Sequence, residues 1–319
     1  MSNFIKLNPF AKTNNNTGFG TSASSYGGRF INKDGSFNVV KEGVAASRRI
    51  SVYHSLLSMP VWKFIGVILL IFISVNLLYT GLYYVAGLDG LTGFIPKSRL
   101  EDFWEVYFFS CETFTTVGYG RMNPTSFGCN IIAATEALSG FLSFAVATGL
   151  IYGRFTRPNA YMLFSQQAVV APYQGITGLM FRLATYKPDH VLTDVDVRVN
   201  LSLTVMENGQ QVFKFYNLEL ERSRIDALSM NLTVVHPITE SSPLYGLTAD
   251  DLAKADAEMY ILVRGYDEVF TAIVQQRTSY TYEEVVFNAK FLPMYRESED
   301  GKTTILELQK ISHYRVLSE

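Results

Sequence analysis

Two long apolar runs stand out from an otherwise polar chain. Residues 64–88 contain no charged side chain, and residues 125–153 contain only one, Glu136. A helix needs about 20 mainly apolar residues to cross the hydrocarbon of a bilayer, so each run predicts a membrane-spanning helix. A weaker apolar segment, residues 103–109, lies between them. The pattern predicts two spans around a short re-entrant segment, within a transmembrane domain at residues 60–157.

The chain before the first span divides into two parts. Residues 1–28 are rich in Asn, Thr, Ser and Gly and have little apolar surface to offset the entropy of ordering, so we expect a disordered arm. In residues 29–59, RFINKDGSFNVV carries a KDG turn and predicts a short strand or hairpin. GVAASRRISVYHSLLSM, residues 43–59, predicts an amphipathic helix lying in the membrane interface. The alternative for this helix is an extension of the first span.

The hydrophobic period changes after Pro158. Residues 194–205 alternate strictly between apolar and polar side chains, which is typical of a half-buried strand. Six apolar side chains share one face of it: Val195, Val197, Val199, Leu201, Leu203 and Val205. Further β-rich runs cover residues 212–221, 232–235, 257–263, 269–275, 284–291 and 303–308, and one short helix is expected at residues 248–255. Residues 158–319 are therefore predicted to form an immunoglobulin-like β-sandwich.

Composition and charge exclude several functions. The chain has 319 residues and a formal net charge of -2, which argues against general nucleic-acid binding, since this requires a basic excess. Its four histidines fall in no catalytic or zinc spacing, and neither GxSxG nor HExxH occurs, so an enzyme is not expected. Two cysteines do not make a disulfide framework.

Basic residues next to the spans predict the orientation of the chain. Arg48, Arg49 and Lys63 flank the first span, and Arg154 and Arg157 flank the second. Because Lys and Arg are enriched on the cytoplasmic side of spans, we expect both termini, and hence the β-sandwich, to be cytoplasmic.

The candidate chemistry lies between the two spans, in SCETFTTVGYGRM, residues 110–122. Non-helical backbone at membrane depth is tolerated only where protein buries it or where it lines a watery path. Glycines that alternate with other residues can turn successive carbonyl groups the same way. Such a row of oxygens could replace the water shell of a cation, and a ring of them requires several chains.

The stretch TTVGYG resembles the selectivity filter of potassium channels, whose signature is TVGYG. The resemblance implies a homotetramer, with residues 101–113 as a pore helix whose negative end favours a cation in the cavity. It also implies K+ as the permeant ion, held by carbonyl oxygens and the threonine hydroxyl, and no organic cofactor. The filter residues would be Thr116, Val117, Gly118, Tyr119 and Gly120.

Four further stretches resemble inward-rectifier potassium channels: RFINKDGSFNV, GLIYGRFTRP, LFSQQAVVAPYQGITGLMFRL and ESSPLYGLTADDLAKADAEMYILVRG. They occur in order between Arg29 and the end of the chain. The chain is thereby identified as a member of the prokaryotic branch of that family. This implies a membrane α plus all-β fold, a two-helix pore with a cytoplasmic sandwich, in the bacterial inner membrane.

The family resemblance places the gates. Tyr152 falls at the crossing of the inner helices, where it would act as a gate. Its alternative role is that of an aromatic residue at the membrane interface. Gly140 falls at an inner-helix hinge, and its alternative is close helix packing. Gly265 and Tyr266 begin the expected constricting loop of the cytoplasmic pore, residues 265–271.

The resemblance also bears on block by intracellular cations. Phe144 stands where strong rectifiers carry an acid, and Arg264 stands where they carry a glutamate. Asp194 matches an acidic position of the family. We therefore expect weak rectification, and Mg2+, polyamines and Ba2+ are the candidate blockers.

The family resemblance also implies residues that support the filter and residues that bind lipid. Glu112 falls where the family often has a glutamate that braces the filter, and Arg121 is its expected partner. Glu136 is expected to be protonated, or hydrogen-bonded behind the filter.

Anionic membrane lipids are expected at Lys63, Arg154 and Arg157, for which orientation of the spans is the alternative role. The competing hypothesis is a non-conducting membrane sensor. The intact filter motif argues against it, because a sensor that does not conduct has no need of a filter.

Overall fold

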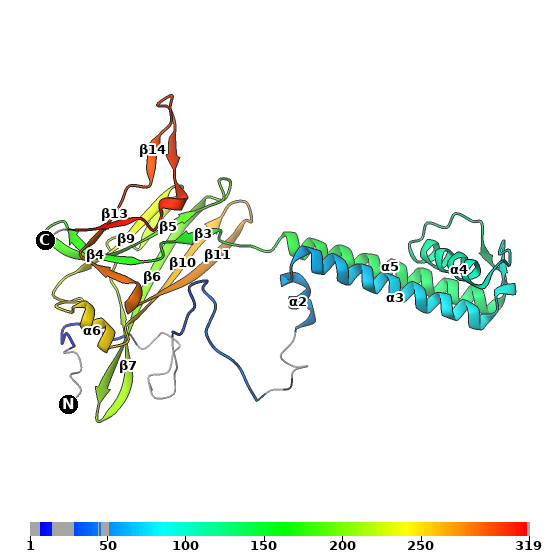
Figure 1. Ribbon diagram of the computed structural model, residues 1–319, viewed down its shortest axis with the longest axis horizontal. Coiled ribbons are helices and arrows are strands. Elements are labelled where there is room, and N and C mark those ends of the chain that lie inside the picture. Colours follow the sequence, from blue (N-terminus) through cyan, green and yellow to red (C-terminus); the bar gives the residue numbers. More distant parts are fainter. Residues whose placement is uncertain (1–6, 15–28, 44, 46–50, 318–319) are drawn as a thin grey trace. The chain divides into compact units, whose positions relative to one another are not determined.

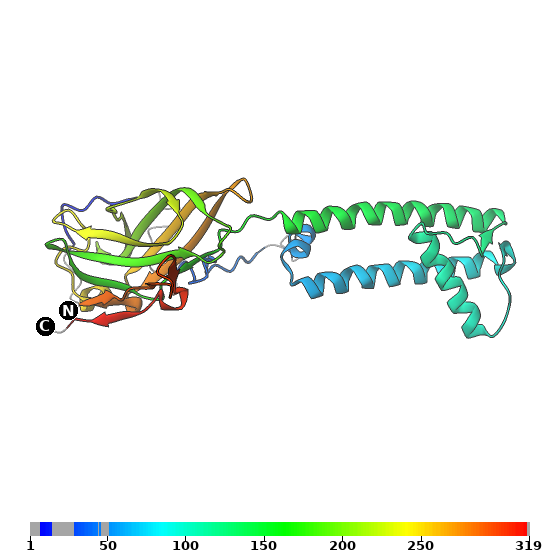
Figure 2. The same cartoon turned by 90° about the horizontal axis from the view of Figure 1, so that it is seen from above.

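The computed structural model describes residues 7–14, 29–43, 45 and 51–317. The chain splits into two compact units (Figures 1 and 2). One unit is Glu42–Arg157, and the other combines Met1–Lys41 with Pro158–Glu319. The N-terminal segment therefore belongs with the sandwich although the whole helical unit separates the two in sequence.

In its described residues the helical unit has four α-helices, which Figure 1 labels. They are α2 (Val52–Ser58), α3 (Val61–Ala86), α4 (Arg99–Phe114) and α5 (Phe127–Phe155). Helices α3 and α5 run side by side in both views, and α4 packs against both near one end of the pair. By length and composition, α3 and α5 can each cross a membrane, as their apolar runs predict.

Helix α2 is separate from α3, so the alternative of a continuous first span is wrong. Ser51 caps its N-terminus, where the Ser51 hydroxyl accepts the His54 N–H, and Pro60 starts the next helix. Proline lacks the N–H that a continuing helix needs, which explains the break. Residues 46–50 of the predicted amphipathic helix lie outside the described residues.

A capping box starts α4, the helix at the position of the expected pore helix. The Ser98 hydroxyl accepts the Glu101 N–H, and the Glu101 carboxylate accepts the Ser98 N–H. The buried side of α4 then packs into a small core with α3 and α5, in which the Tyr83 and Phe109 rings meet edge to face at 5.3 Å. This packing holds the C-terminal end of α4, where the non-helical stretch begins.

Two five-stranded sheets build the second unit. The first has the order β11-β10-β6-β7 with β8 also on β6, and the second has the order β12-β4-β5-β3 with β9 also on β5. The first sheet comprises β6 (Leu192–Glu207), β7 (Gln210–Asn217), β8 (Arg224–Leu228), β10 (Glu258–Asp267) and β11 (Ala272–Thr281). The second comprises β3 (Met162–Phe164), β4 (Ala168–Tyr173), β5 (Ile176–Thr185), β9 (Asn231–Ile238) and β12 (Val285–Phe287).

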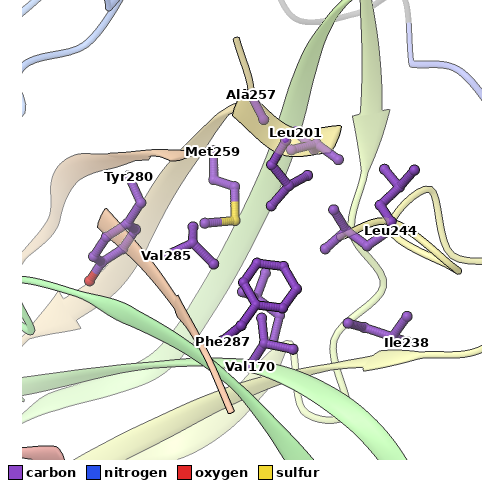
Figure 3. A pocket seen from close by; sticks show the side chains of 12 residues that line it. Val170, Leu201, Ile238, Leu244, Ala257, Met259, Tyr280, Val285 and Phe287 are labelled. Carbon is purple, nitrogen blue, oxygen red and sulfur yellow. The ribbon is translucent and has the colours of Figure 1, made fainter. Parts of the chain in front are cut away.

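The main core lies between these two sheets. All six apolar residues of the alternating strand are buried there, which confirms the predicted half-buried strand. The helix predicted at residues 248–255 is α6 (Ala249–Lys254), and the hydroxyl of Thr248 caps it. A cavity of about 20 Å³ remains in this core, between side chains such as Met259, Tyr280 and Phe287 (Figure 3). It is small and apolar, so it is a packing gap rather than a ligand site.

The N-terminal segment is attached to the sandwich. The N–H groups of Phe30 and Ile31 donate to the Glu258 carboxylate at 3.0 and 3.4 Å. Residues 7–14, which composition predicts to be disordered, also contact it, and the Asn14 N–H donates to the Phe215 carbonyl at 2.6 Å. The rest of the predicted arm lies outside the described residues.

Candidate functional site: a cation filter and its supports

The stretch after α4 has an alternating backbone. Thr116, Gly118 and Gly120 have φ angles of 59°, 54° and 82°, whereas Val117 and Tyr119 between them have negative φ. A β-branched residue such as Thr116 rarely adopts positive φ, because its side chain then crowds the backbone. Such strain is retained at functional sites, where the surrounding structure enforces it. The alternation is the one expected of a row of carbonyl groups that face one side.

The hydrogen bonds of this stretch involve its N–H groups. Val117 and Gly118 both donate to the Glu112 carbonyl, at 2.9 and 3.3 Å, and Thr116 donates to the Thr113 carbonyl at 3.0 Å. Among the described residues, no group donates to the carbonyl oxygens of residues 116–119. Residues 116–119 are all exposed in the single chain. These four oxygens are therefore available to a cation.

A hollow of about 730 Å³ lies next to the start of this stretch. It is bounded by the end of α4 and by α3 and α5, and its lining is mainly apolar. Phe144 lines it and is 74% exposed in the single chain. The last carbonyls of α4 carry the partial negative charge of a helix C-terminus, which favours a cation at this position.

Gly140 brings α5 against the end of α4. A Cβ atom at this position would lie 1.8 Å from the Phe114 carbonyl oxygen, so only glycine fits. This contact gives Gly140 the packing role that the sequence left as an alternative to a hinge. Helix α5 continues through this position without a break.

The expected ion pair between Glu112 and Arg121 is wrong. Arg121 Nη1 instead lies 2.5 Å from Glu105 Oε1. The reason is the direction of the chain: residues 117 and 118 bond to the Glu112 carbonyl, and the chain then runs back along α4. Residue 121 consequently reaches a position two helical turns before Glu112, because seven residues span about 10 Å of helix.

Glu136 is held inside the helical unit. The Tyr83 hydroxyl donates to it at 2.7 Å, and the Ser110 hydroxyl also donates to it. The side chain is fully buried, so these partners are needed to offset its desolvation. This arrangement confirms the hydrogen-bonded role that was one of its two expected states. Sequence reasoning missed both partners, since neither belongs to a recognisable motif.

The basic residues near the ends of the spans differ in their surroundings. Arg154 donates to the carbonyls of Leu56, Leu57 and Met59, the last at 2.5 Å, and so binds the C-terminal end of α2. Lys63 and Arg157 are exposed.

Tyr152, in the last turn of α5, is 70% exposed in the single chain. Large exposed aromatic and aliphatic side chains also cover much of α3 and α5.

In the sandwich, Gly265 and Tyr266 are not in a loop, and this part of the prediction is wrong. Both lie in β10, where they pair with Val274 and Ile273 of β11. Gly265 is packed against Val195 and Leu192. The turn itself is shorter, at residues 268–271. Strand β10 lies between β11 and β6, and a local sequence signal does not reveal this pairing with a strand as distant in sequence as β6.

The charged residues expected in the cytoplasmic pore lie together in one hollow of the sandwich. Asp194 accepts from Arg224 at 3.1 Å, and Arg264 is the cross-strand neighbour of Asp196. Asp196 in turn pairs with Arg198 at 2.8 Å. Sequence reasoning missed Arg198 and Arg224, which balance the acids and give the hollow a mixed charge.

No cluster of three or more His, Cys, Asp or Glu side chains suited to a metal ion occurs within the described residues. His236, considered above as one of four histidines, is buried between the Glu219 carbonyl at 2.6 Å and the Ser242 hydroxyl at 2.8 Å. Burial lowers its pKa, so it is a neutral, satisfied strand residue. Within the described residues, the carbonyls of residues 116–119 are the candidate ion-binding groups.

Comparison with known proteins agrees with this geometry. Residues 162–315 match the family model of the inward rectifier potassium channel C-terminal domain, and residues 65–157 match a family model described as ion channel. The chain is 33% identical over 279 residues to the inward rectifier potassium channel Kirbac3.1 of Paramagnetospirillum magnetotacticum, covering 87% of this chain and 92% of that protein.

More distant relatives include the ATP-sensitive inward rectifier potassium channel 14 of Rattus norvegicus and of Mus musculus. Each is 27% identical over 292 residues, covering 84% of this chain and 66% of the relative. Among solved structures, the sporulation control protein Spo0M of Bacillus subtilis matches 41% of this chain and 50% of its own with a TM-score of 0.23 and 7% identity, which is too weak to indicate a shared fold.

Two apolar helices of membrane-spanning length, a sandwich that matches the C-terminal domain model, and extensive identity to a bacterial relative lead to one conclusion. The chain belongs to the inward-rectifier potassium channel family, in its prokaryotic branch, and is a membrane ion-transport protein rather than an enzyme.

Proposed function

We propose that four copies of this chain surround one axis and conduct dehydrated K+ through a filter of residues 116–120. The observation that carries this proposal is the alternating backbone, with its free carbonyls at residues 116–119. Each chain supplies one row of oxygens, and four rows replace the hydration shell of the ion. The Thr116 hydroxyl completes the innermost site.

We assign the inner gate to Tyr152. Four tyrosines at the ends of the inner helices would narrow the mouth and exclude water. Its exposure in the single chain supports this assignment, because a side chain facing the axis has no partner within its own chain. Gly140 contributes by fixing the inner helix against α4. We also propose that Gly265 and Tyr266 form a second constriction in the cytoplasmic pore, from the end of the interior strand β10 and not from a loop.

The proposed rectification is weak. Phe144 offers no charge in the cavity, and Arg264 places a cation where block by Mg2+ or polyamines needs an acid. The pairing of Asp194 with Arg224 supports the same conclusion, since a paired carboxylate attracts a second cation less strongly.

Anionic lipids are proposed to contact Lys63 and Arg157, both exposed beside the spans. Arg154 acts differently, because its guanidinium already binds the carbonyls of α2. We place the channel in the bacterial inner membrane with both termini cytoplasmic, following the distribution of basic residues.

Rubidium uptake into liposomes with high internal KCl tests the proposed function. We expect uptake that Ba2+ blocks and that Na+ does not compete for. Gly118→Asp should abolish it, because a side chain at this positive φ position disrupts the carbonyl row.

A matched control is Gly209→Asp, which changes another glycine of positive φ in an open turn of the sandwich. Uptake that persists in Gly118→Asp would contradict the filter. If the tetramer shows no uptake and Tyr152→Ala does not restore it, the non-conducting sensor is favoured instead.

A further inference from the structure

We propose that Glu105 is a positioning residue for the outer end of the filter: it holds the Arg121 guanidinium and neutralises it, and this neutralisation sets the affinity of the outer mouth for cations. The inference rests on the proposed conduction through residues 116–120. It concerns a residue seven positions before Glu112, which no motif of the filter includes.

The pair joins a buried anion to a partly solvated cation. Glu105 Oε1 lies 2.5 Å from Arg121 Nη1, and the side chains are 8% and 62% exposed respectively. A carboxylate within a re-entrant helix is costly unless it is paired. Arg121 is therefore the group that makes Glu105 tolerable, and Glu105 is the group that fixes where the arginine lies.

The backbone of Arg121 is fixed as well. A Cβ atom added to Gly93 would lie 1.9 Å from the Arg121 carbonyl oxygen, so the two backbone segments are in contact. The chain then enters β2 (Asn123–Pro124), which pairs with β1 (Leu91–Thr92). The Asn123 amide also donates to the Gly120 carbonyl at 3.0 Å. With the backbone held by β1 and β2, Glu105 decides the direction of the side chain.

The position of Arg121 gives the pair an electrostatic effect. It directly follows Gly120, so a tetramer would carry four guanidinium groups around the outer end of the ion path. Each is balanced by one carboxylate at hydrogen-bond distance. Removal of the carboxylates would leave four unbalanced positive charges next to the path and repel an entering cation.

The test is external Ba2+ block of the full-length channel in planar bilayers. For Glu105→Gln we expect the Ba2+ affinity to fall by about tenfold, which corresponds to about 1.4 kcal/mol. The double variant Glu105→Gln with Arg121→Gln should return to within about twofold of wild type, since it removes both charges. Asp89→Asn, which neutralises an exposed acid of the outer loop, is the matched control and should leave the affinity unchanged.

A second readout does not require conduction. The melting temperature of the purified tetramer should fall in Arg121→Gln, which leaves the buried Glu105 carboxylate without its partner, and should recover in the double variant. If Glu105→Gln does not assemble, this recovery decides the question: a double variant that also fails to assemble overturns the proposal.

Unchanged Ba2+ affinity in Glu105→Gln, or a double variant no better than the single ones, also overturns it. The proposed function fails in a different way, through a wild-type protein without Ba2+-sensitive rubidium uptake. The melting-temperature cycle remains informative in that case.

Discussion

His190 Nδ1 lies 2.7 Å from Asp267 Oδ2, and the Asp267 side chain is fully buried. The other carboxylate oxygen, Oδ1, accepts the Phe270 N–H at 2.9 Å, so this aspartate ties the loop before β6 to the turn after β10. The His190 ring also lies against Tyr161, with ring centroids 4.7 Å apart. The turn that follows Gly265 and Tyr266 is thus anchored from two sides.

Replacement of this histidine should destabilise the sandwich. In His190→Ala, Asp267 keeps its backbone donor but loses its side-chain partner while buried, and we expect a loss of about 3 kcal/mol in the free energy of unfolding. Urea unfolding of the detergent-solubilised chain, followed by near-UV circular dichroism, measures it. His313→Ala, at an exposed histidine, is the control. A His190→Ala transition that coincides with the control would show that the pair adds nothing.

The attachment of the N-terminal segment should depend on pH. Burial raises the pKa of Glu258 above its ordinary value of 4.5, although the Phe30 and Ile31 N–H groups act in the opposite direction. The folded state therefore binds the proton more tightly than the unfolded state does. This contribution to stability is fully present below pH 4.5 and is lost as the pH rises through the folded pKa.

Glu258→Gln isolates this contribution. The unfolding free energy of wild type should fall relative to that of the variant as the pH rises from 4 to 8. Chemical unfolding at several pH values provides the measurement. A difference that stays constant over this range, or that shifts in favour of wild type, would contradict the burial effect.

Gly140→Ala should separate α4 from α5. The added Cβ would lie 1.8 Å from the Phe114 carbonyl oxygen, and backbone cannot yield as a flexible side chain can. We expect a loss of about 3 kcal/mol in stability from overpacking, together with loss of Ba2+-sensitive uptake. Gly149→Ala on the same helix meets no atom within 4 Å in the single chain and is the control. Normal uptake by Gly140→Ala would show that the contact is not required.

Phe144→Glu should convert weak rectification into strong rectification. Four carboxylates in the cavity next to the filter would attract Mg2+ and polyamines, and we expect internal spermine to bind at least about tenfold more tightly. Phe144→Gln has a similar shape without the charge and should remain weakly rectifying. Voltage-dependent block in planar bilayers distinguishes the two. Equal block in both variants would argue that Phe144 does not face the ion path.

Some parts of the molecule could be predicted because their signal is local. The strand at residues 194–205 could be predicted from its alternating side chains, and its six apolar residues are buried. The two candidate membrane-spanning helices could be predicted from the length and composition of their apolar runs. By contrast, β4 and β5 were not predicted, because both are buried over consecutive residues and lack alternation.

Other features depend on parts of the chain that meet only after folding. Gly265 is a strand residue because it pairs with Val274 of β11 and lies at a bulge in the pairing of β10 with β6, whereas its glycine suggested a loop. The partner of Arg121 depends on the filter running back along α4, which no spacing reveals. Composition likewise did not predict that residues 7–14 would contact the sandwich.

The contact between Gly140 and Phe114 has a mechanical consequence. With no side chain between the two backbones, there is no soft layer to absorb a displacement of one helix relative to the other. Phe114 is the last residue of α4, and Thr116 begins the carbonyl row two positions later. A sideways movement of α5 at this level must either open a gap or carry the start of residues 116–120 with it. In the proposed channel, the inner mouth and the innermost ion site would therefore be unable to move independently.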